Sequence, residues 1–199
     1  MQERIQERIF VIGPVRNIDK VTYAVIEKWV HAREAEGYKV HWPARGDTNQ
    51  DDPVGLDICT ANREAIREAC RVGIWFDDKS RGSIFDLGML YYFLRDAFTG
   101  VEVINETVLE WPNPHITLWD VILELGINTS PESREAIHQS SKIDVLVDVS
   151  DNNALFHMGM AFASLRDERK KIVILNKNQI SPTPRKSFEN VFLKLEKAS

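Results

Sequence analysis

The sequence has few cysteines, no long apolar run and no excess of positive charge. Its two cysteines, Cys59 and Cys70, are too few for a disulfide framework and lack the spacing of zinc ligands, so we expect both to be reduced and structural. No run approaches the roughly 20 apolar residues of a membrane span, and the start of the chain, residues 1–8, is charged rather than apolar as in a signal peptide. These absences predict a cytoplasmic protein with no membrane partner.

The charge balance is mildly acidic. The 25 Lys and Arg residues are outnumbered by 30 Asp and Glu residues, which gives a net charge of -5. A nucleic acid polymer or an anionic membrane selects basic faces, so neither is the expected main partner. A small anionic ligand stays compatible with this charge, because a few local donors can hold it. The five histidines form no metal-ligand pattern, and no metal or organic cofactor is predicted.

Apolar runs and helical patterns alternate along the first half of the chain. The runs predict strands at 9–12, 38–42, 72–76 and 101–104. Helical spacing predicts helices between Asp19 and Gly37, over about 55–69 and over 84–96. This alternation predicts an α/β fold with a doubly wound, mainly parallel sheet and helices on both faces, a three-layer arrangement like that of Rossmann and flavodoxin folds.

The second half contains a partial copy of the first. A shift of 71 positions superposes residues 63–96 on 134–167 without a gap, with Gly88-Met89 identical to Gly159-Met160. The copy carries His157 in place of Asp86, and we expect this histidine to be a packed or surface residue. An ungapped match through a loop favours true duplication of a helix-strand-loop-helix unit over chance similarity.

The duplication divides the chain into two parts. Residues 1–105 form the first α/β unit, and residues 106–199 contain the copy, which carries Asn153 in place of Gly82. In this part we expect a turn at 111–114, a helix at 118–125, a strand at 171–175 and a short amphipathic helix at 188–195. The copied unit either extends the first sheet or forms a pseudo-symmetric partner to it.

The stretch from residue 72 to 89 predicts a strand, a short charged loop and a helix. In an open α/β sheet, ligands bind beyond the carboxyl ends of the strands, where this loop places Ser80, Gly82 and Asp86. We expect Asp86 in the first helical turn, where backbone N–H groups favour anions and keep it a carboxylate. The alternatives are that Ser80 only caps the helix, Asp86 only complements the helix dipole, and Gly82 only serves a tight turn.

Three motifs occur here in a fixed order. Residues 12–16 (IGPVR) follow the first strand, a polar loop at 44–53 follows the second, and residues 80–88 (SRGSIFDLG) follow the third. With the motifs in this order, within alternating strands and helices, residues 8–105 resemble the nucleoside 2-deoxyribosyltransferase superfamily. This superfamily includes the 2′-deoxynucleoside 5′-monophosphate N-glycosidases. The resemblance implies a substrate that is a small nucleoside or nucleotide. It also implies a homodimer in which the partner subunit completes the wall of the active site, unless the second copy supplies that wall within the chain.

The resemblance also implies roles for individual residues. The position of Asp86 is that of a carboxylate which attacks C1′ of the deoxyribose and expels the base. Ser80 and Arg16 match phosphate contacts, which favours nucleotides, although Arg16 can also be read as a solvated surface residue. The remaining substrate-binding positions that the resemblance implies are Gly13, Pro14, Gly82, and, for the base, Asn49 and Gln50.

Three residues depart from the pattern of the superfamily. Asp86 is one methylene shorter than the usual glutamate, Asn62 replaces an aspartate that orients or protonates the substrate, and Phe10 replaces a tyrosine. The favoured prediction is N-glycosidic cleavage of a (deoxy)nucleoside 5′-monophosphate, with Asp86 as nucleophile and Asn62 as orienter. Two alternatives stay open: base exchange by a nucleoside 2-deoxyribosyltransferase, and a non-catalytic nucleotide-binding or regulatory module.

Overall fold

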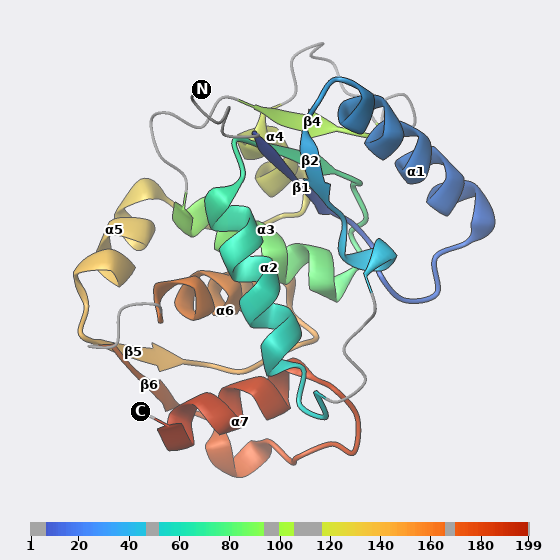
Figure 1. The fold of residues 1–199 in the computed structure, drawn as a ribbon. Helices are drawn as coiled ribbons and strands as arrows, with labels where there is room; N and C mark the ends of the chain where they lie inside the picture. The colour runs from blue at the N-terminus through green and yellow to red at the C-terminus, as the bar shows by residue number, and fades with distance from the viewer. Residues whose placement is uncertain (1–6, 47–51, 94–99, 106–116, 166–169, 199) are drawn as a thin grey trace, which may run out of the picture.

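The computed structural model describes residues 7–46, 52–93, 100–105, 117–165 and 170–198 (Figure 1). Several sequence predictions lie outside these residues. They are the base contacts Asn49 and Gln50, the end of the third helix at 94–96, and the turn at 111–114.

The first half of the chain forms a four-stranded parallel sheet. Its strands are β1 (Arg8–Ile12), β2 (Lys39–His41), β3 (Arg71–Ile74) and β4 (Val101–Val103), in the order β2-β1-β3-β4. Three helices connect them: α1 (Lys20–Ala35), α2 (Leu56–Glu68) and α3 (Arg81–Phe93). A short 3-10 helix, Pro43–Arg45, follows β2. The predicted α/β fold with a doubly wound parallel sheet is confirmed.

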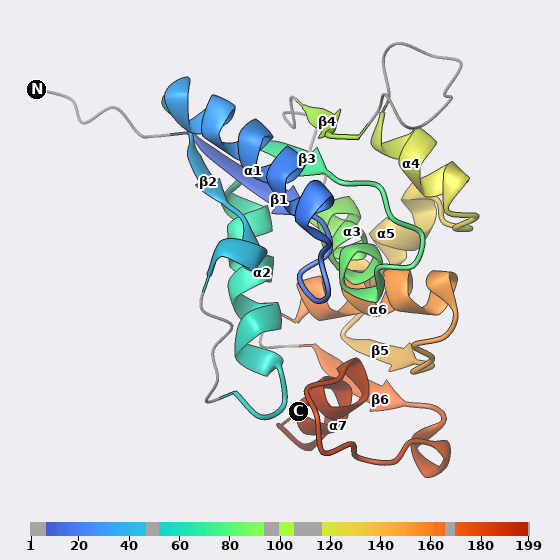
Figure 2. The ribbon, with the colours of Figure 1, turned by 90° about the vertical axis from the view of Figure 1, so that its right-hand side faces the viewer.

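Helices cover both faces of this sheet (Figures 1 and 2). Val11 of β1 points to one face and packs in a core with Ile26 and Val30 of α1. Phe10 and Ile12 point to the other face and belong to the larger core that α2 and α3 complete. The alternation of side chains along a strand therefore turns one continuous apolar run into two cores.

The ends of α1 follow from local chemistry. The Asp19 carboxylate accepts hydrogen bonds from the backbone N–H groups of Val21 and Thr22, each at 2.9 Å, and caps the helix as predicted. Gly37 follows the last turn with φ at 97°, a left-handed conformation that glycine adopts without steric cost.

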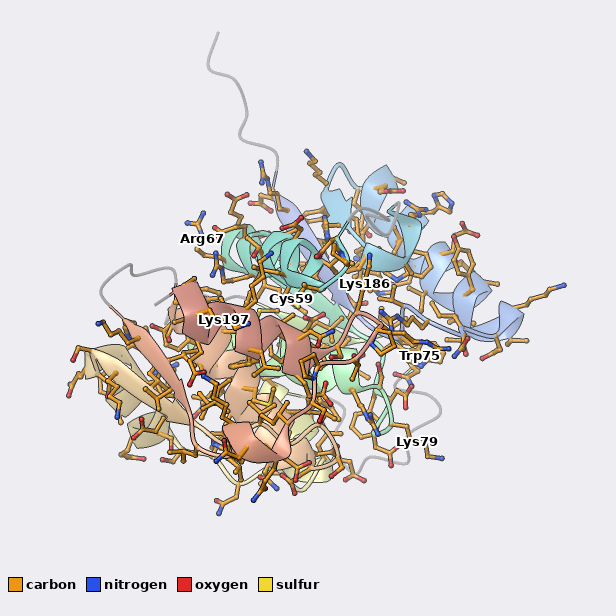
Figure 3. The ribbon with its side chains drawn as sticks, turned by 90° about the horizontal axis from the view of Figure 1, so that it is seen from below. Cys59, Arg67, Trp75, Lys79, Lys186 and Lys197 are labelled. Carbon is orange, nitrogen blue, oxygen red and sulfur yellow. The ribbon has the colours of Figure 1, made fainter. Side chains whose placement is uncertain are left out.

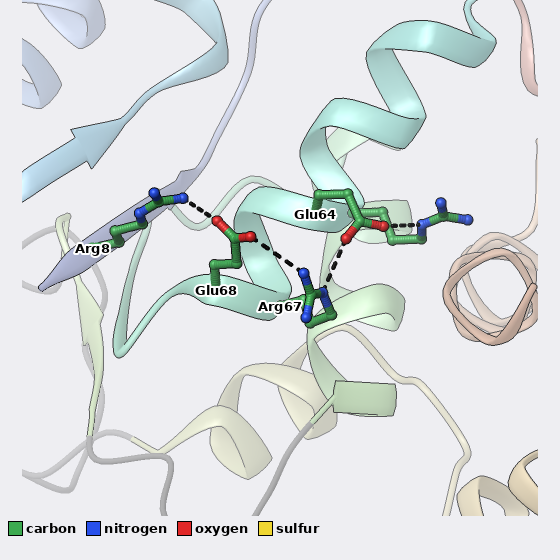
Figure 4. Close-up of polar contacts among 5 residues, drawn as sticks. Arg8, Glu64, Arg67 and Glu68 are labelled. Carbon is green, nitrogen blue, oxygen red and sulfur yellow. Dashed lines mark hydrogen bonds and ion pairs between the residues drawn. The ribbon is translucent and has the colours of Figure 1, made fainter. Parts of the chain in front are cut away.

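Charged side chains on the surface connect α2 to β1 (Figure 4). Arg8 of β1 pairs with Glu68, which also receives a hydrogen bond from Arg67 at 3.2 Å. Arg67 and Arg63 then share Glu64, at 3.0 and 3.1 Å. Because these groups are partly exposed to solvent, such a network contributes modestly to stability, and the apolar core holds the helix in place.

The second half forms its own small parallel sheet, of β5 (Lys142–Val145) and β6 (Lys171–Ile174). Its helices are α4 (Leu118–Glu124), α5 (Pro131–Gln139), α6 (Asn152–Ser164) and α7 (Phe188–Ala198). A 3-10 helix, Lys177–Gln179, follows β6. None of the helices in the described part of the chain has both the length and the apolar character needed to cross a membrane.

The duplication extends beyond the residues that the sequence matched. Both α3 and α6 begin and end 71 positions apart, and the pairs of residues that join β3 to β4 recur at the same shift in β5 and β6. After β4, the Asn105 amide accepts from the Phe76 N–H at 2.8 Å and donates to its carbonyl at 3.0 Å. Asn176 makes the same pair of bonds with Val147, at 3.0 and 2.9 Å.

Candidate functional site

The candidate site lies where β1 and β3 end. The two strands are neighbours in the sheet, and the Trp75 N–H donates to the Ile12 carbonyl at 2.8 Å. A Cβ on Gly13 would come within 3.3 Å of Trp75 Cβ, so a glycine here lets the two loops leave the sheet side by side. The connections from β1 and β3 run in opposite directions along the sheet, and such a switch point is where open α/β sheets bind ligands.

Asp86 is buried beyond this edge of the sheet. The prediction that Asp86 lies in the first helical turn is wrong. Because α3 begins at Arg81 rather than Ile84, Asp86 is in the second turn. The free N–H groups of the helix start do not reach that far, and the side chain is only 7% exposed. Burial raises the pKa of Asp86 from 3.8 to about 7, and a hydrogen bond from Asn62 works against this rise. The carboxyl group is therefore poised between its two forms near neutral pH.

Asn62 of α2 orients the Asp86 carboxyl group. Its Nδ2 donates to Asp86 Oδ2 at 3.3 Å, and both side chains are buried. The Asn62 side chain is also hydrogen-bonded to His41 at the end of β2. The ring of Phe10 stacks on His41 with centroids 5.4 Å apart, so the residue that replaces the expected tyrosine supports this histidine. Burial lowers the pKa of His41, and the bond to Asn62 opposes that shift.

Two further residues, Asp52 and Cys59, lie in this region, and the sequence did not place either of them there. The Asp52 carboxylate accepts hydrogen bonds from four backbone N–H groups at the start of α2, including that of Gly55 at 2.8 Å. Burial works to raise the pKa of Asp52, but these four bonds prevail and lower it. Burial, together with the charges of Asp86 and Asp52, raises the pKa of Cys59, so this thiol stays protonated. Figure 3 shows Cys59 on α2 on the side of the molecule seen from below.

Ser80 caps α3, as the alternative interpretation held. Its Oγ accepts from the Ser83 N–H at 3.4 Å and from the Ser83 hydroxyl at 2.7 Å. Ser80, Ser83 and Asp86 follow one another at three-residue intervals, so neighbouring side chains form one row along the helix. The sequence analysis missed Ser83, although its three-residue spacing from both neighbours is visible in the sequence. Whether Ser80 also contacts a phosphate remains a prediction.

The other predicted residues occupy the rim of the site. Arg16 is exposed and Pro14 half-buried in the loop after β1. Gly82 is in the first turn of α3 rather than in a tight turn, and a Cβ there would meet nothing within 4 Å. Close packing therefore does not require a glycine at this position. The structure brings Asp86, Asn62 and Ser80 to the same end of the sheet.

His157, which takes the place of Asp86 in the copy, is half-buried and its Nδ1 lies 2.7 Å from the Asn153 carbonyl oxygen. Cys59 is buried, and the half-buried Cys70 donates from its Sγ to the Arg8 carbonyl oxygen at 3.2 Å. Among the described residues, no cluster of three or more His, Cys, Asp or Glu side chains has the arrangement needed to hold a metal ion.

Comparison of the chain with models of protein families, with curated proteins and with solved structures found no match. Fold and geometry together define a doubly wound α/β protein with a buried carboxyl group that an amide orients, at the edge where other open α/β sheets bind their ligands.

Proposed function

We propose that the protein cleaves the N-glycosidic bond of a (deoxy)nucleoside 5′-monophosphate, with Asp86 as nucleophile. The observation that carries the proposal is the position of its carboxyl group, buried at the carboxyl edge of the sheet and hydrogen-bonded to the Asn62 amide. Buried carboxyl groups with a raised pKa are uncommon away from functional sites, because the charged form is destabilised there.

The proposed chemistry uses two steps. The ionised Asp86 carboxylate attacks C1′ while the bond from C1′ to the base nitrogen breaks, and the base leaves with the electron pair and takes a proton from solvent. Water then attacks C1′ of the glycosyl ester, which releases the sugar phosphate and restores the carboxylate. Asn62 holds the carboxylate in position but has no proton to transfer. Only the ionised fraction of Asp86 reacts, so activity rises with pH through about 7.

The proposed phosphate contacts come from the loops around Asp86. The Ser80 hydroxyl accepts two hydrogen bonds from Ser83, which leaves its own proton for a phosphate oxygen. Backbone N–H groups at the start of α3 face the same region, and Arg16 in the loop after β1 offers a guanidinium for a bidentate contact. A serine at position 80 accommodates an anion that an aspartate would repel.

The test is release of free base. Purified protein is incubated with a panel of ribo- and deoxynucleoside 5′-monophosphates and with the corresponding nucleosides, and the products are separated by chromatography. We expect base release from one or more monophosphates and loss of at least a hundredfold in rate in Asp86→Ala, with nucleotide binding retained by calorimetry. His157→Ala changes the equivalent position of the copy and is the matched control. Release that persists in Asp86→Ala would remove the nucleophile, and base exchange between nucleosides would indicate a transferase.

A second candidate is a non-catalytic nucleotide-binding module. The observation that favours it is the amide of Asn62, which cannot act as an acid beside the leaving base. Asn62→Asp separates the two functions, because it supplies an acid at this position. The amide bond to Asp86 Oδ2 is then replaced by a contact between two carboxyl groups, one of which carries a proton. A wild type that binds nucleotide without releasing base, and gains activity in Asn62→Asp, would establish the module.

The proposed location is the cytoplasm. Its support is the low cysteine content, two in 199 residues, as in proteins that do not depend on disulfides. Free nucleoside monophosphates in the same compartment would be the substrate pool. Fractionation of cells that express the full chain tests the location.

A further inference from the structure

The two copies pack against each other through α3 and α6. A Cβ added at Gly88 of α3 would overlap the carbonyl oxygen of Phe156, and one added at Gly159 of α6 would overlap that of Phe85. Gly159 is the copy of Gly88, and Phe156 is the copy of Phe85. Each glycine therefore admits the backbone of the opposite helix, and the contact relates the two copies by an approximate two-fold axis.

The surrounding side chains make contacts that recur when each residue is replaced by its copy. The Arg63 guanidinium lies 5.2 Å from the ring of Phe162, and the Arg134 guanidinium lies 5.7 Å from the ring of Tyr91. Arg134 is the copy of Arg63, and Phe162 is the copy of Tyr91. The Phe85–Phe162 and Tyr91–Phe156 ring centroids are both 5.6 Å apart. Such reciprocity is the property of an isologous dimer interface.

This interface leaves α3 without a free face. Every residue of the helix from Ser83 to Tyr92 is buried, and side chains of both halves form one hydrophobic core. A second chain approaching through α3 would have to displace α6, with the loss of that shared core.

In the copy, the residues that replace Gly82 and Asp86 form hydrogen bonds within the chain. Asn153, in place of Gly82, accepts from the Asn128 N–H at 2.6 Å and donates to the Gly126 carbonyl at 3.4 Å. The backbone carbonyl oxygen of Asn153 is hydrogen-bonded to Nδ1 of His157, the residue that replaces Asp86. Residues 126–128 are therefore held against the start of α6, whereas a Cβ at Gly82 in α3 would meet nothing within 4 Å.

The C-terminal segment reaches from the copy toward the first half. Phe188 stacks on Phe85, the neighbour of Asp86, with centroids 4.4 Å apart. Lys186 Cβ lies 3.5 Å from the position of a Cβ built on Gly55, which precedes α2. Residues 186–188 thus connect the helices that carry Asp86 and Asn62, and Figure 3 shows Lys186 on the same side of the molecule as Cys59.

We propose that the second half is a built-in replacement for a second subunit: the chain acts as a monomer with one ligand site, and residues 186–188 form the wall of that site which a partner would otherwise supply. The number of ligands and the wall rest on the proposed function, whereas the monomeric state does not. The ligand is a nucleoside 5′-monophosphate bound beside Asp86, and the copy binds none.

The first measurement is the mass of the full chain by light scattering after size exclusion, over micromolar concentrations. We expect 22.9 kDa, the mass of one chain. The second is calorimetric titration with the nucleoside 5′-monophosphate that binds best, with an expected stoichiometry of one per chain that His157→Ala leaves unchanged. A particle of twice the chain mass, or two ligands per chain, would overturn the inference. A monomer that binds no nucleotide would contradict the proposed function and not the subunit replacement.

The wall has its own test. Phe188→Ala should weaken nucleotide binding about tenfold without changing the mass, because it removes the ring that holds the segment against Phe85. The matched control is Leu195→Ala, a change of another partly buried residue of α7. It should lower stability and leave nucleotide affinity unchanged. Equal affinity losses in the two variants, or none in Phe188→Ala, would remove the segment from the site.

Discussion

The units β3-α3-β4 and β5-α6-β6 have the same strand pairing and helix bounds but differ in the residues that follow their first strands. Both units keep the glycine between α3 and α6 and the asparagine after their second strand. At the start of the helix the first unit has Ser80, Gly82 and Asp86, and the second has Asp151, Asn153 and His157. The glycine and phenylalanine at the closest contact of the two copies are thus identical, whereas the residues at the start of the helix differ.

The largest expected effect concerns the shared glycines. Gly88→Ala and Gly159→Ala should each lower the free energy of unfolding by more than about 3 kcal/mol, because the added methyl group overlaps a backbone carbonyl that cannot move away alone. Urea unfolding followed by circular dichroism measures both. The two losses should be similar, since the contacts exchange under the approximate two-fold axis. Tolerance of one substitution and not the other would contradict the reciprocal packing.

The sequence predicted the scaffold better than the site. Apolar runs, Asp19 as a cap and Gly37 after α1 specify the parallel sheet, because strand burial and helix ends depend on neighbouring residues. The ungapped shift also identified the copied unit. Asn105 and Asn176 were missed because their bonds join residues 29 positions apart, which no local pattern shows.

The candidate site was predicted in part. The motif brought Ser80 and Asp86 together, but the start of α3 was placed three residues late. Because of this error, Asp86 was expected to be a carboxylate stabilised by the helix dipole. It is instead buried, and its pKa is raised. Asp52 was missed because Gly55, with φ at 93°, separates it from the helix that it caps and breaks the usual cap spacing. The contact of His41 with Asn62 depends on how β2 and α2 pack, which the sequence does not specify.

A second prediction uses the buried carboxyl group that the copy lacks. The folded chain holds the Asp86 proton up to about pH 7, whereas the unfolded chain releases it near 3.8. The folded state therefore loses stability as the pH rises through this window. Asp86→Asn removes the loss and should raise the free energy of unfolding by roughly 2–3 kcal/mol at pH 8, with no gain below about pH 4.

Urea titrations at pH 4, 6 and 8 measure this dependence. The control in the second unit is Asp148→Asn, because hydrogen bonds from the Ser150 hydroxyl and backbone N–H lower the pKa of Asp148. That variant should show no gain at pH 8. An Asp86→Asn variant whose stability follows the wild type at every pH would show that the carboxyl group is ionised in the folded chain.

The asparagines after β4 and β6 provide a smaller effect. Asn105→Ala removes the two hydrogen bonds that the amide makes with the N–H and carbonyl of Phe76 and should cost about 2 kcal/mol. Asn176→Ala breaks the same bonds to Val147 but should cost only about 1 kcal/mol, because Asn105 is buried and Asn176 is half-buried, so water can replace the latter. Thermal unfolding of both variants gives the comparison, and a larger loss for Asn176→Ala would contradict it.

The smallest expected change in stability is at the position where the copy has closed its loop. Gly82→Asn introduces the residue of the second copy into the first turn of α3, where the added Cβ meets nothing within 4 Å. Asparagine has the higher helix propensity, so stability should rise by a few tenths of a kcal/mol, while a side chain placed beside Ser80 should weaken nucleotide binding at least fivefold. Gly82→Ala is the matched control, with a similar or greater stabilisation of about 0.5–1 kcal/mol and a smaller loss of affinity. If calorimetry finds equal affinities in Gly82→Asn and the wild type, the open loop of the first unit is not the place where the ligand binds.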